Sequence, residues 1–470
     1  MLRKNILCFI ILLFGCASSD WRAKTVNFAS FESSKAFEMD SISFGTGMVV
    51  KKYRLTNGLK IIILEDHSAP VFAYHTWFNV GSRNERDGIT GIAHLFEHLM
   101  FKETKNTKEG EFDKILEEQG GRINAATYVD WTFYRESLPK EAFATVVSLE
   151  ADRMQHMILN DAQVNSEREV VANERRFRVD NSPGGIMYEQ LHKAAFSLHP
   201  YHWPVIGWMK DIQAINLKDC IEFYKTYYAP NNSTVVVVGD VETEEVLKTI
   251  NKAYGAIPAS TIPPEKIPSE PQQTEEKRIE IEQPIPAQKV LIGFHVPDSL
   301  HEDLPALSVA HALLFDGKSS RLYRRLITDS QIASEAGGWV NQTKDPGLQI
   351  IDISMKTGHQ AQEALKIVYE ELERLSKEDV SDDELQKAKN RLETSFWNNF
   401  KTADSKAESL GFHEIVSKDY RKLFEEIPRL KKVQASDVRR VATQYYVSQN
   451  RTLVVATPKA NSQNAPKGKR

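Results

Sequence analysis

Apolar and polar positions alternate along the chain in a way that divides it into two blocks, each beginning with strands. In the first block, the apolar run Ile61–Leu64 follows Asn57-Gly58, a pair typical of a β-hairpin turn. Helical periodicity then alternates with strands up to Val235–Val238, and a helix is expected near 243–254. The second block begins with predicted strands at 278–282 and 289–294.

The ends of the two blocks carry the same residues at the same offsets. The shared series is Asp219, Tyr227, Tyr228, Asn232 and Thr234 in the first block, and Asp437, Tyr445, Tyr446, Asn450 and Thr452 in the second. Agreement over such a stretch predicts two tandem domains of one fold, at 48–257 and 278–458, with the tyrosine pairs in their cores. Residues 258–277 between them hold five prolines and are interpreted as a linker.

The two ends of the chain predict export and solvent exposure. Residues 1–16 combine a basic start, an apolar run and Gly15-Cys16, as in a secretory signal that ends in a bacterial lipobox. We expect Cys16 to be lipidated, residues 17–47 to form a polar tether, and 459–470 to be a disordered basic tail. Ala17 in place of aspartate favours the outer membrane, where we expect the chain to face the periplasm.

Composition narrows the function. The 470 residues carry 60 basic and 64 acidic side chains, for a net charge of -4, which disfavours nucleic-acid binding. Of the three cysteines, Cys220 is the only one beyond the predicted signal and lipobox, so no disulfide framework can form within the mature chain. Stability must therefore come from packing.

The strongest chemical signal lies in the first domain. His94 and His98 are four residues apart within an apolar helical pattern, so both imidazoles project from one face and can reach one metal ion, with Glu97 beside them. Zinc sites usually need a third protein ligand. Glu167 and Glu174 are seven apart on a second predicted helix, where one could bind the metal and the other orient a ligand imidazole. A solvated charged helix and two ordinary polar histidines are the alternative interpretation.

These residues carry a family resemblance. His94-x-x-Glu97-His98, with Glu174 following 76 positions later and Glu167 preceding it, resembles the insulinase and pitrilysin family of inverted zinc metallopeptidases. The flanking segments 80–85, 121–127 and 200–207 resemble its short, two-domain branch, which includes mitochondrial processing peptidase. The resemblance implies an α+β fold in which two homologous domains, each a mainly antiparallel sheet packed with helices, form a clamshell around a peptide.

The resemblance also implies roles for individual residues. His94, His98 and Glu174 would bind one Zn²⁺, Glu97 would be the general base, and Glu167 would support the site. The segment Asn124, Ala125, Ala126 and Thr127 looks like the family's edge strand, which pairs with the substrate backbone. The implied activity is that of a zinc metalloendopeptidase acting on extended peptides in an enclosed chamber.

One departure affects the expected assembly. Self-sufficient family members carry an arginine and a tyrosine seven residues apart in the second domain, but the matching positions here are Ile327 and Ser334. By resemblance to the paired members, we expect this chain to be the catalytic subunit of a heterodimer whose related partner supplies that pair. A homodimer is one alternative. A non-catalytic structural or peptide-capture subunit of a membrane-associated complex is another.

Overall fold

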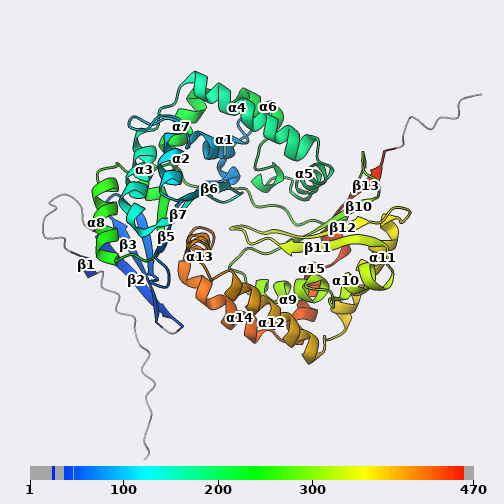
Figure 1. Ribbon diagram of the computed structural model, residues 1–470. Coiled ribbons are helices and arrows are strands. Elements are labelled where there is room, and N and C mark those ends of the chain that lie inside the picture. The colour runs from blue at the N-terminus through cyan, green and yellow to red at the C-terminus, as the bar shows by residue number, and fades with distance from the viewer. Residues whose placement is uncertain (1–23, 27–35, 46, 460–470) are drawn as a thin grey trace, which may run out of the picture.

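Two β-sheets, each covered by helices, organise the chain (Figure 1). The computed structural model describes residues 24–26, 36–45 and 47–459. The first sheet runs in the order β1-β2-β3-β4-β8-β5-β7-β6 and the second in the order β11-β12-β10-β13-β9. The strands of the first sheet are β1 (Lys24–Val26), β2 (Ala36–Phe44), β3 (Met48–Leu55), β4 (Lys60–Glu65), β5 (Val71–Phe78), β6 (Arg122–Thr127), β7 (Thr132–Pro139) and β8 (Ser233–Gly239). Those of the second are β9 (Lys277–Gln283), β10 (Lys289–Val296), β11 (Ala333–Val340), β12 (Gly347–Met355) and β13 (Arg451–Pro458).

Helices account for most of the remaining chain. In the first half they are α1 (Ile92–Leu99), α2 (Glu111–Glu118), α3 (Phe143–His156), α4 (Asp161–Arg175), α5 (Pro183–Ala195), α6 (Met209–Ala214), α7 (Leu217–Tyr227) and α8 (Thr243–Tyr254). In the second half they are α9 (Leu304–Phe315), α10 (Arg321–Tyr323), α11 (Ala361–Lys377), α12 (Asp382–Asn398), α13 (Ala403–Val416), α14 (Glu426–Lys432) and α15 (Ala435–Tyr445).

The two sheets share one five-stranded unit. The order β4-β8-β5-β7-β6 in the first corresponds to β9-β13-β10-β12-β11 in the second. In both units the first pair of strands is parallel and the other three pairs are antiparallel. The prediction of an α+β protein with two tandem domains and mainly antiparallel sheets is therefore confirmed.

The repeated sequence series has the same local structure in both domains. The Asn232 side chain donates to the carbonyl of Tyr227 at 2.9 Å, and Asn450 donates to that of Tyr445 at 2.8 Å. Each asparagine therefore ties the end of a helix to the strand that follows it, β8 or β13. The second tyrosine of each pair, Tyr228 or Tyr446, is buried, as the repeat predicts.

The N-terminal part of the first sheet corrects one prediction. Residues 36–44, expected to belong to a tether, form strand β2, which pairs antiparallel with β3. Its alternating apolar side chains explain the difference, since Ile42 and Phe44 pack against the core that lies between the first sheet and α13. The predicted signal, Cys16, most of the rest of the tether and residues 460–470 lie outside the described residues.

The predicted hairpin and linker are both observed. Gly58 has φ +94°, a backbone conformation that favours glycine, in the turn between β3 and β4. Residues 258–276 contain neither helix nor strand, and Glu270 within them accepts hydrogen bonds from the backbone N–H groups of residues 197–199. Among the helices of the described residues, none is long and apolar enough to cross a bilayer.

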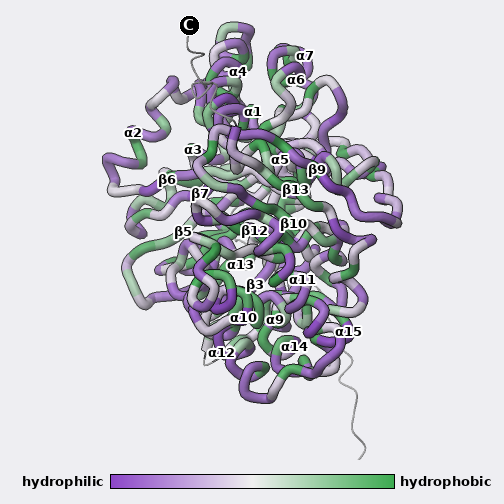
Figure 2. Tube along the Cα trace, turned by 90° about the vertical axis from the view of Figure 1, so that its right-hand side faces the viewer, coloured by the Kyte–Doolittle hydropathy of each residue, from purple (hydrophilic) through white to green (hydrophobic). Residues whose placement is uncertain are grey.

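Each domain lends one helix to the other. Helix α5 packs on β13 and β10 of the second sheet, while α13 packs on β5 and β8 of the first, as the positions of the two helices in Figure 1 show. The distribution of hydropathy agrees with a core built on the sheets. Hydrophobic residues gather along the central strands, whereas the outer helices α2 and α4 are largely hydrophilic (Figure 2). The exchange couples the two domains through apolar cores as well as through the linker.

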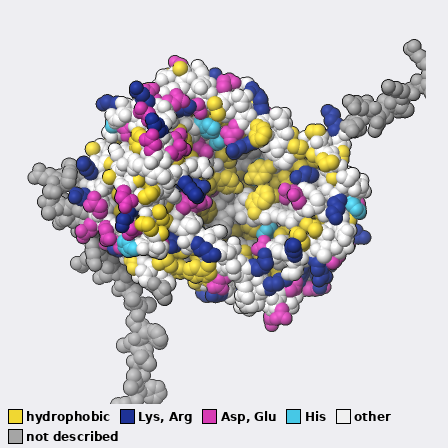
Figure 3. Space-filling view, in the orientation of Figure 1, with side chains coloured by type: hydrophobic (Ala, Val, Ile, Leu, Met, Phe, Trp, Pro, Cys, Tyr) yellow, Lys and Arg dark blue, Asp and Glu magenta, His cyan; other side chains and the backbone are white. Residues whose placement is uncertain are grey.

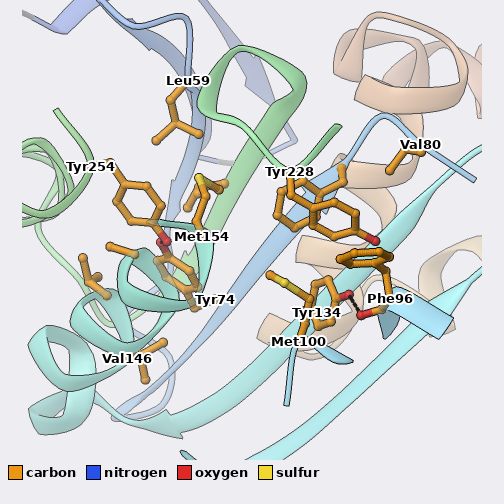
Figure 4. Packing of buried hydrophobic residues seen from close by; sticks show 14 of the residues in the cluster. Leu59, Tyr74, Val80, Phe96, Met100, Tyr134, Val146, Met154, Tyr228 and Tyr254 are labelled. Atoms are coloured by element: carbon orange, nitrogen blue, oxygen red, sulfur yellow. Dashed lines mark hydrogen bonds between the residues drawn. The ribbon is translucent and has the colours of Figure 1, made fainter. Parts of the chain in front are cut away.

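The first domain's main core fixes the position of α1. Phe96 on this helix packs among Tyr134, Tyr224 and Tyr228, and the Tyr134 hydroxyl donates to the Phe96 carbonyl at 3.1 Å (Figure 4). Ile92, Leu95, Phe96 and Leu99 are all buried. With this face committed to the core, the histidine-bearing face of α1 is left for chemistry.

Candidate metal centre

Contacts with two loops, the one before α1 and the one that contains Ile206, fix where α1 begins. Gly91, the residue before the helix, has φ +92°, and a Cβ there would lie 2.4 Å from the Ile206 carbonyl oxygen. Such close contact requires glycine. The Glu85 carboxylate accepts hydrogen bonds from the backbone N–H groups of Gly91 and Ala93, both at 2.8 Å, and so satisfies donors at the helix N-terminus. These contacts explain why segments 80–85 and 200–207 accompany the histidine motif.

The structure brings His94, His98 and Glu174 together. The Glu174 Oε2 atom lies 3.6 Å from His94 Nε2 and 3.3 Å from His98 Nε2. One ligand atom from each residue falls within 4.8 Å of the other two. Helices α1 and α4 pack against each other, which is how residues 76 positions apart in sequence converge.

The donor set fits zinc. Two imidazole nitrogens and one carboxylate oxygen are the ligands of a catalytic zinc site that keeps its fourth position open. Glu174 Oε2 is buried without a hydrogen-bond partner among the described residues, although it faces both imidazoles. A buried carboxylate oxygen in this state is costly unless a cation or a donor compensates it. The residues present are therefore suited to hold a divalent ion.

The two histidines differ in their electrostatic surroundings. Burial, aided by the charge of His98, lowers the pKa of His94 to about 4, so its imidazole is neutral and can donate a lone pair. Burial also acts to lower the pKa of His98, but the nearby carboxylates of Glu167 and Glu174 outweigh it and raise that pKa to about 9. Metal binding would therefore displace a proton from His98.

Glu167 stands behind His98. Its Oε2 atom is 3.5 Å from His98 Nδ1, and its Oε1 atom is 2.7 Å from the Lys102 ammonium. The carboxylate thus bridges the outer nitrogen of one imidazole and a lysine, an arrangement that fixes the orientation of a ligand ring. Lys102 was not predicted from the sequence; it lies four residues after His98, just beyond the end of α1, and that proximity is the signal that could have found it.

Glu97 lies on α1 between the two histidines. Burial raises the pKa of its carboxyl, while the nearby Thr127 hydroxyl and the charge of His98 oppose that rise. A carboxylate with a raised pKa beside a metal site can accept and return a proton near neutral pH. Thr127 ends strand β6, so this carboxylate lies close to the edge of the sheet.

The predicted substrate-binding segment is an edge strand. Residues 124–127 belong to β6, the last strand of the first sheet, which pairs only with β7 among the described strands. Its other edge therefore offers backbone groups for pairing. The molecular surface is hollowed between the two domains, with hydrophobic side chains lining the hollow (Figure 3).

In the second domain, the residues at the positions of the family's arginine and tyrosine make contacts of their own. Ile327 packs against the core of that domain, and the Ser334 hydroxyl donates to the Ser354 carbonyl at 3.2 Å. The nearby Arg324 and Arg325 are paired with acidic side chains of their own domain: Asp329 for the first, and Glu370 and Glu371 for the second. None of these residues takes the place of the family's arginine and tyrosine.

Comparisons with known proteins agree on the family of the chain. The sequence profile described as Insulinase (Peptidase family M16) matches residues 60–207, and that described as Peptidase M16 inactive domain matches residues 214–392. A "Zinc protease PqqE" of Helicobacter pylori is 33% identical over 89% of this chain and 96% of its own length. A "Probable mitochondrial-processing peptidase subunit beta" of Arabidopsis thaliana is 25% identical over 83% of this chain and 75% of its own.

A solved structure extends the agreement to the fold. The crystal structure of a protease from Helicobacter pylori superposes with a TM-score of 0.83 at 33% identity, covering 87% of this chain and 99% of that one. The relatives and the fold are those of a metallopeptidase family. The chain belongs to the insulinase family, peptidase family M16, in its short two-domain form.

Proposed function

We propose that this chain is a zinc metalloendopeptidase, with one Zn²⁺ held by His94, His98 and Glu174. The observation that carries the proposal is the convergence of these three ligand groups, with Glu97 on the same helix as the two histidines. When bound there, zinc would polarise the scissile carbonyl and lower the pKa of a coordinated water to about 7.

The chain's own residues account for proton transfer and ligand support. Glu97 is the general base: it takes a proton from the attacking water and delivers it to the leaving amine. Glu167 positions the His98 imidazole through its Nδ1 side and is itself held by Lys102. Substrate binds as an additional strand on β6, so the site selects extended peptides and cleaves within them inside the chamber between the domains.

We also propose that the active form is a heterodimer. Its basis is the absence of a free arginine and tyrosine pair around Ile327 and Ser334 in the described second domain. The Arabidopsis relative is named as the beta subunit of a processing peptidase, which fits a catalytic chain that works beside a related one. The partner would supply the arginine and tyrosine that bind the peptide and polarise its carbonyl.

The direct test is hydrolysis of an internally quenched peptide by the zinc-loaded chain that starts at Ser18. We expect a chelator to abolish cleavage and added zinc to restore it. If the isolated chain binds zinc but does not cleave, a related subunit carrying the missing pair should switch cleavage on. Zinc-bound chains that stay inactive with that partner would reject the peptidase in favour of a structural or capture role.

Lipid anchoring through Cys16, at the outer membrane facing the periplasm, is proposed from the sequence alone. The test is incorporation of labelled fatty acid into the full chain and into its Cys16→Ser variant. Label in the wild type only is the expected result. Equal labelling of both, or of neither, would reject the anchor.

A further inference from the structure

Glu174 has a second neighbour besides the histidines. The chain continues from α4 into a π-helical turn, η3 (Arg176–Asp180), and places the Arg178 Nε atom 2.9 Å from Glu174 Oε1. The other carboxylate oxygen, Oε2, faces the two imidazoles. Arg178 therefore lies one carboxylate away from the proposed metal position, and wide helical turns of this kind recur at functional sites.

Most of the Arg178 guanidinium remains free. The group carries five N–H donors in a planar fork, and its ion pair with Glu174 is the only one that it makes among the described residues. Its side chain is 68% exposed. In contrast, the nearby Arg175 is buried and paired with both Asp180 and Glu189. One edge of the Arg178 guanidinium thus contacts Glu174, and the other edge is exposed to solvent.

Arg178 lies close to the residues that would hold the metal. One oxygen of the Glu174 carboxylate contacts its guanidinium, and the other faces His94 and His98. The free edge of the guanidinium is therefore close enough to meet a substrate group near the cleaved bond.

We propose that Arg178 is a substrate-binding residue that takes a carboxylate of the bound peptide on the free edge of its guanidinium. A guanidinium fork matches a carboxylate with two parallel hydrogen bonds, which makes an acidic group its preferred partner. This inference rests on the proposed function, because it assumes that a peptide occupies the hollow between the domains. It gives the chain a preference for acidic peptides that the second domain's paired arginines do not supply.

Binding measured in an inactive background tests the proposal separately from catalysis. In the zinc-loaded Glu97→Gln chain, fluorescence anisotropy would compare two pairs of peptides. One pair has amidated C-termini and differs by Glu or Gln beside the central bond; the other has neutral side chains and differs by a free or amidated C-terminus. We expect one acidic peptide to bind about 10-fold more tightly than its neutral twin, and the pair concerned identifies the source of the carboxylate.

Arg178→Gln should remove that preference and weaken the acidic peptide about 10-fold, whereas the neutral twin should change by less than about 2-fold. Arg176→Gln is the matched control, because Arg176 is exposed in the same turn but contacts Asn173 instead of Glu174. Equal weakening of acidic and neutral peptides would overturn the proposal. So would loss of zinc from the Arg178→Gln chain in a chelator competition, which would make Arg178 only a positioning residue. Absence of hydrolysis by the wild type would reject the proposed function and leave this binding result unaffected.

Discussion

Glu167 and Glu174 lie seven residues apart on α4, yet they have different neighbours. Glu174 faces both imidazole Nε2 atoms, while Glu167 faces the outer nitrogen of His98 and the Lys102 ammonium. The difference follows from position along α4: Glu167, about two turns nearer the N-terminus of α4, faces the outer nitrogen of the second histidine. The proposed ligand and supporting roles thus follow from position on α4.

Removing the supporting charge should weaken metal binding without abolishing it. In Glu167→Gln, the His98 imidazole loses its anionic partner, so zinc affinity should fall by about 10- to 100-fold. Competition with a chromophoric chelator measures the change. Glu169→Gln is the matched control, since Glu169 is exposed on the same helix and should leave affinity within about 2-fold. Equal affinities for all three chains would contradict the role given to Glu167.

Sequence spacing could predict this residue set only in part. His94 and His98 follow from helical periodicity, and the carboxylate pair on a second helix follows from the need for a third ligand. Lys102 and Arg178 were not predicted, because their partners depend on how α1, α4 and the η3 turn pack. Two exposed-looking basic residues in a charged stretch give no sign of that packing.

At the scale of elements, α13 packs against the first sheet at Gly411, which faces Trp77 of β5. A Cβ on Gly411 would lie 2.1 Å from the Trp77 indole nitrogen, so only glycine allows this approach. Trp77 cannot move away, because it is 1% exposed and stacks on Phe133 with ring centroids 4.3 Å apart. The contact joins the second half of the chain to β5 of the first sheet.

Gly411→Ala should therefore destabilise the protein, despite the better helix propensity of alanine. Overpacking against the indole should lower the free energy of unfolding by about 2 kcal/mol. Gly184→Ala in α5 is the control, since no atom lies within 4 Å of its added Cβ and the change should be neutral or stabilise by up to about 1 kcal/mol. Urea denaturation compares the two. An unchanged midpoint for Gly411→Ala would show that the interface yields at little cost.

The sequence predicted helices and strands, but not that α5 and α13 each pack on the sheet of the other domain. The Asn57-Gly58 hairpin, helix 243–254 and the repeated Tyr-Tyr series are all local patterns, and all were found. Nothing local says which sheet α5 or α13 covers, because an amphipathic helix fits either. Strand β2 was missed for a related reason: its apolar side chains sit among polar ones, in a stretch that resembles a tether.

At the scale of the whole molecule, a polar network closes the junction beside the site. Arg83 of the first domain is buried and pairs with Asp130 at 3.0 Å and with Asp345 of the second domain at 2.6 Å. His199 approaches the same Asp345 carboxylate at 3.1 Å. Asp130 follows β6 by three residues, so this junction fixes the far end of the proposed substrate strand.

The Asp345 carboxylate should make domain contact depend on acid pH. Its hydrogen bond with His199 and the charge of Arg83 lower its pKa below the ordinary 3.8, against the effect of burial. A lowered folded-state pKa means that this stabilisation is fully present above about pH 4 and is lost as pH falls through the folded value.

Asp345→Asn should therefore be less stable than the wild type at pH 7, by up to about 1 kcal/mol, and the difference should shrink below pH 4. Urea unfolding between pH 7 and pH 3 measures this. Asp87→Asn is the control, because Asp87 is exposed and outside the ion pairs of the described residues. A constant difference across the range would show that Asp345 acts through packing and not through its charge.

One comparison tests the proposed role of Glu97 as the base of a zinc peptidase site. Wild-type and Glu97→Gln chains, both starting at Ser18 and both shown to hold one zinc, are incubated with an unfolded polypeptide, alone and with the related partner subunit. Mass spectrometry then identifies the products. We expect cuts at internal bonds by the wild type and none by Glu97→Gln. Equal cleavage by both chains, or no cleavage by either under both conditions, would contradict it.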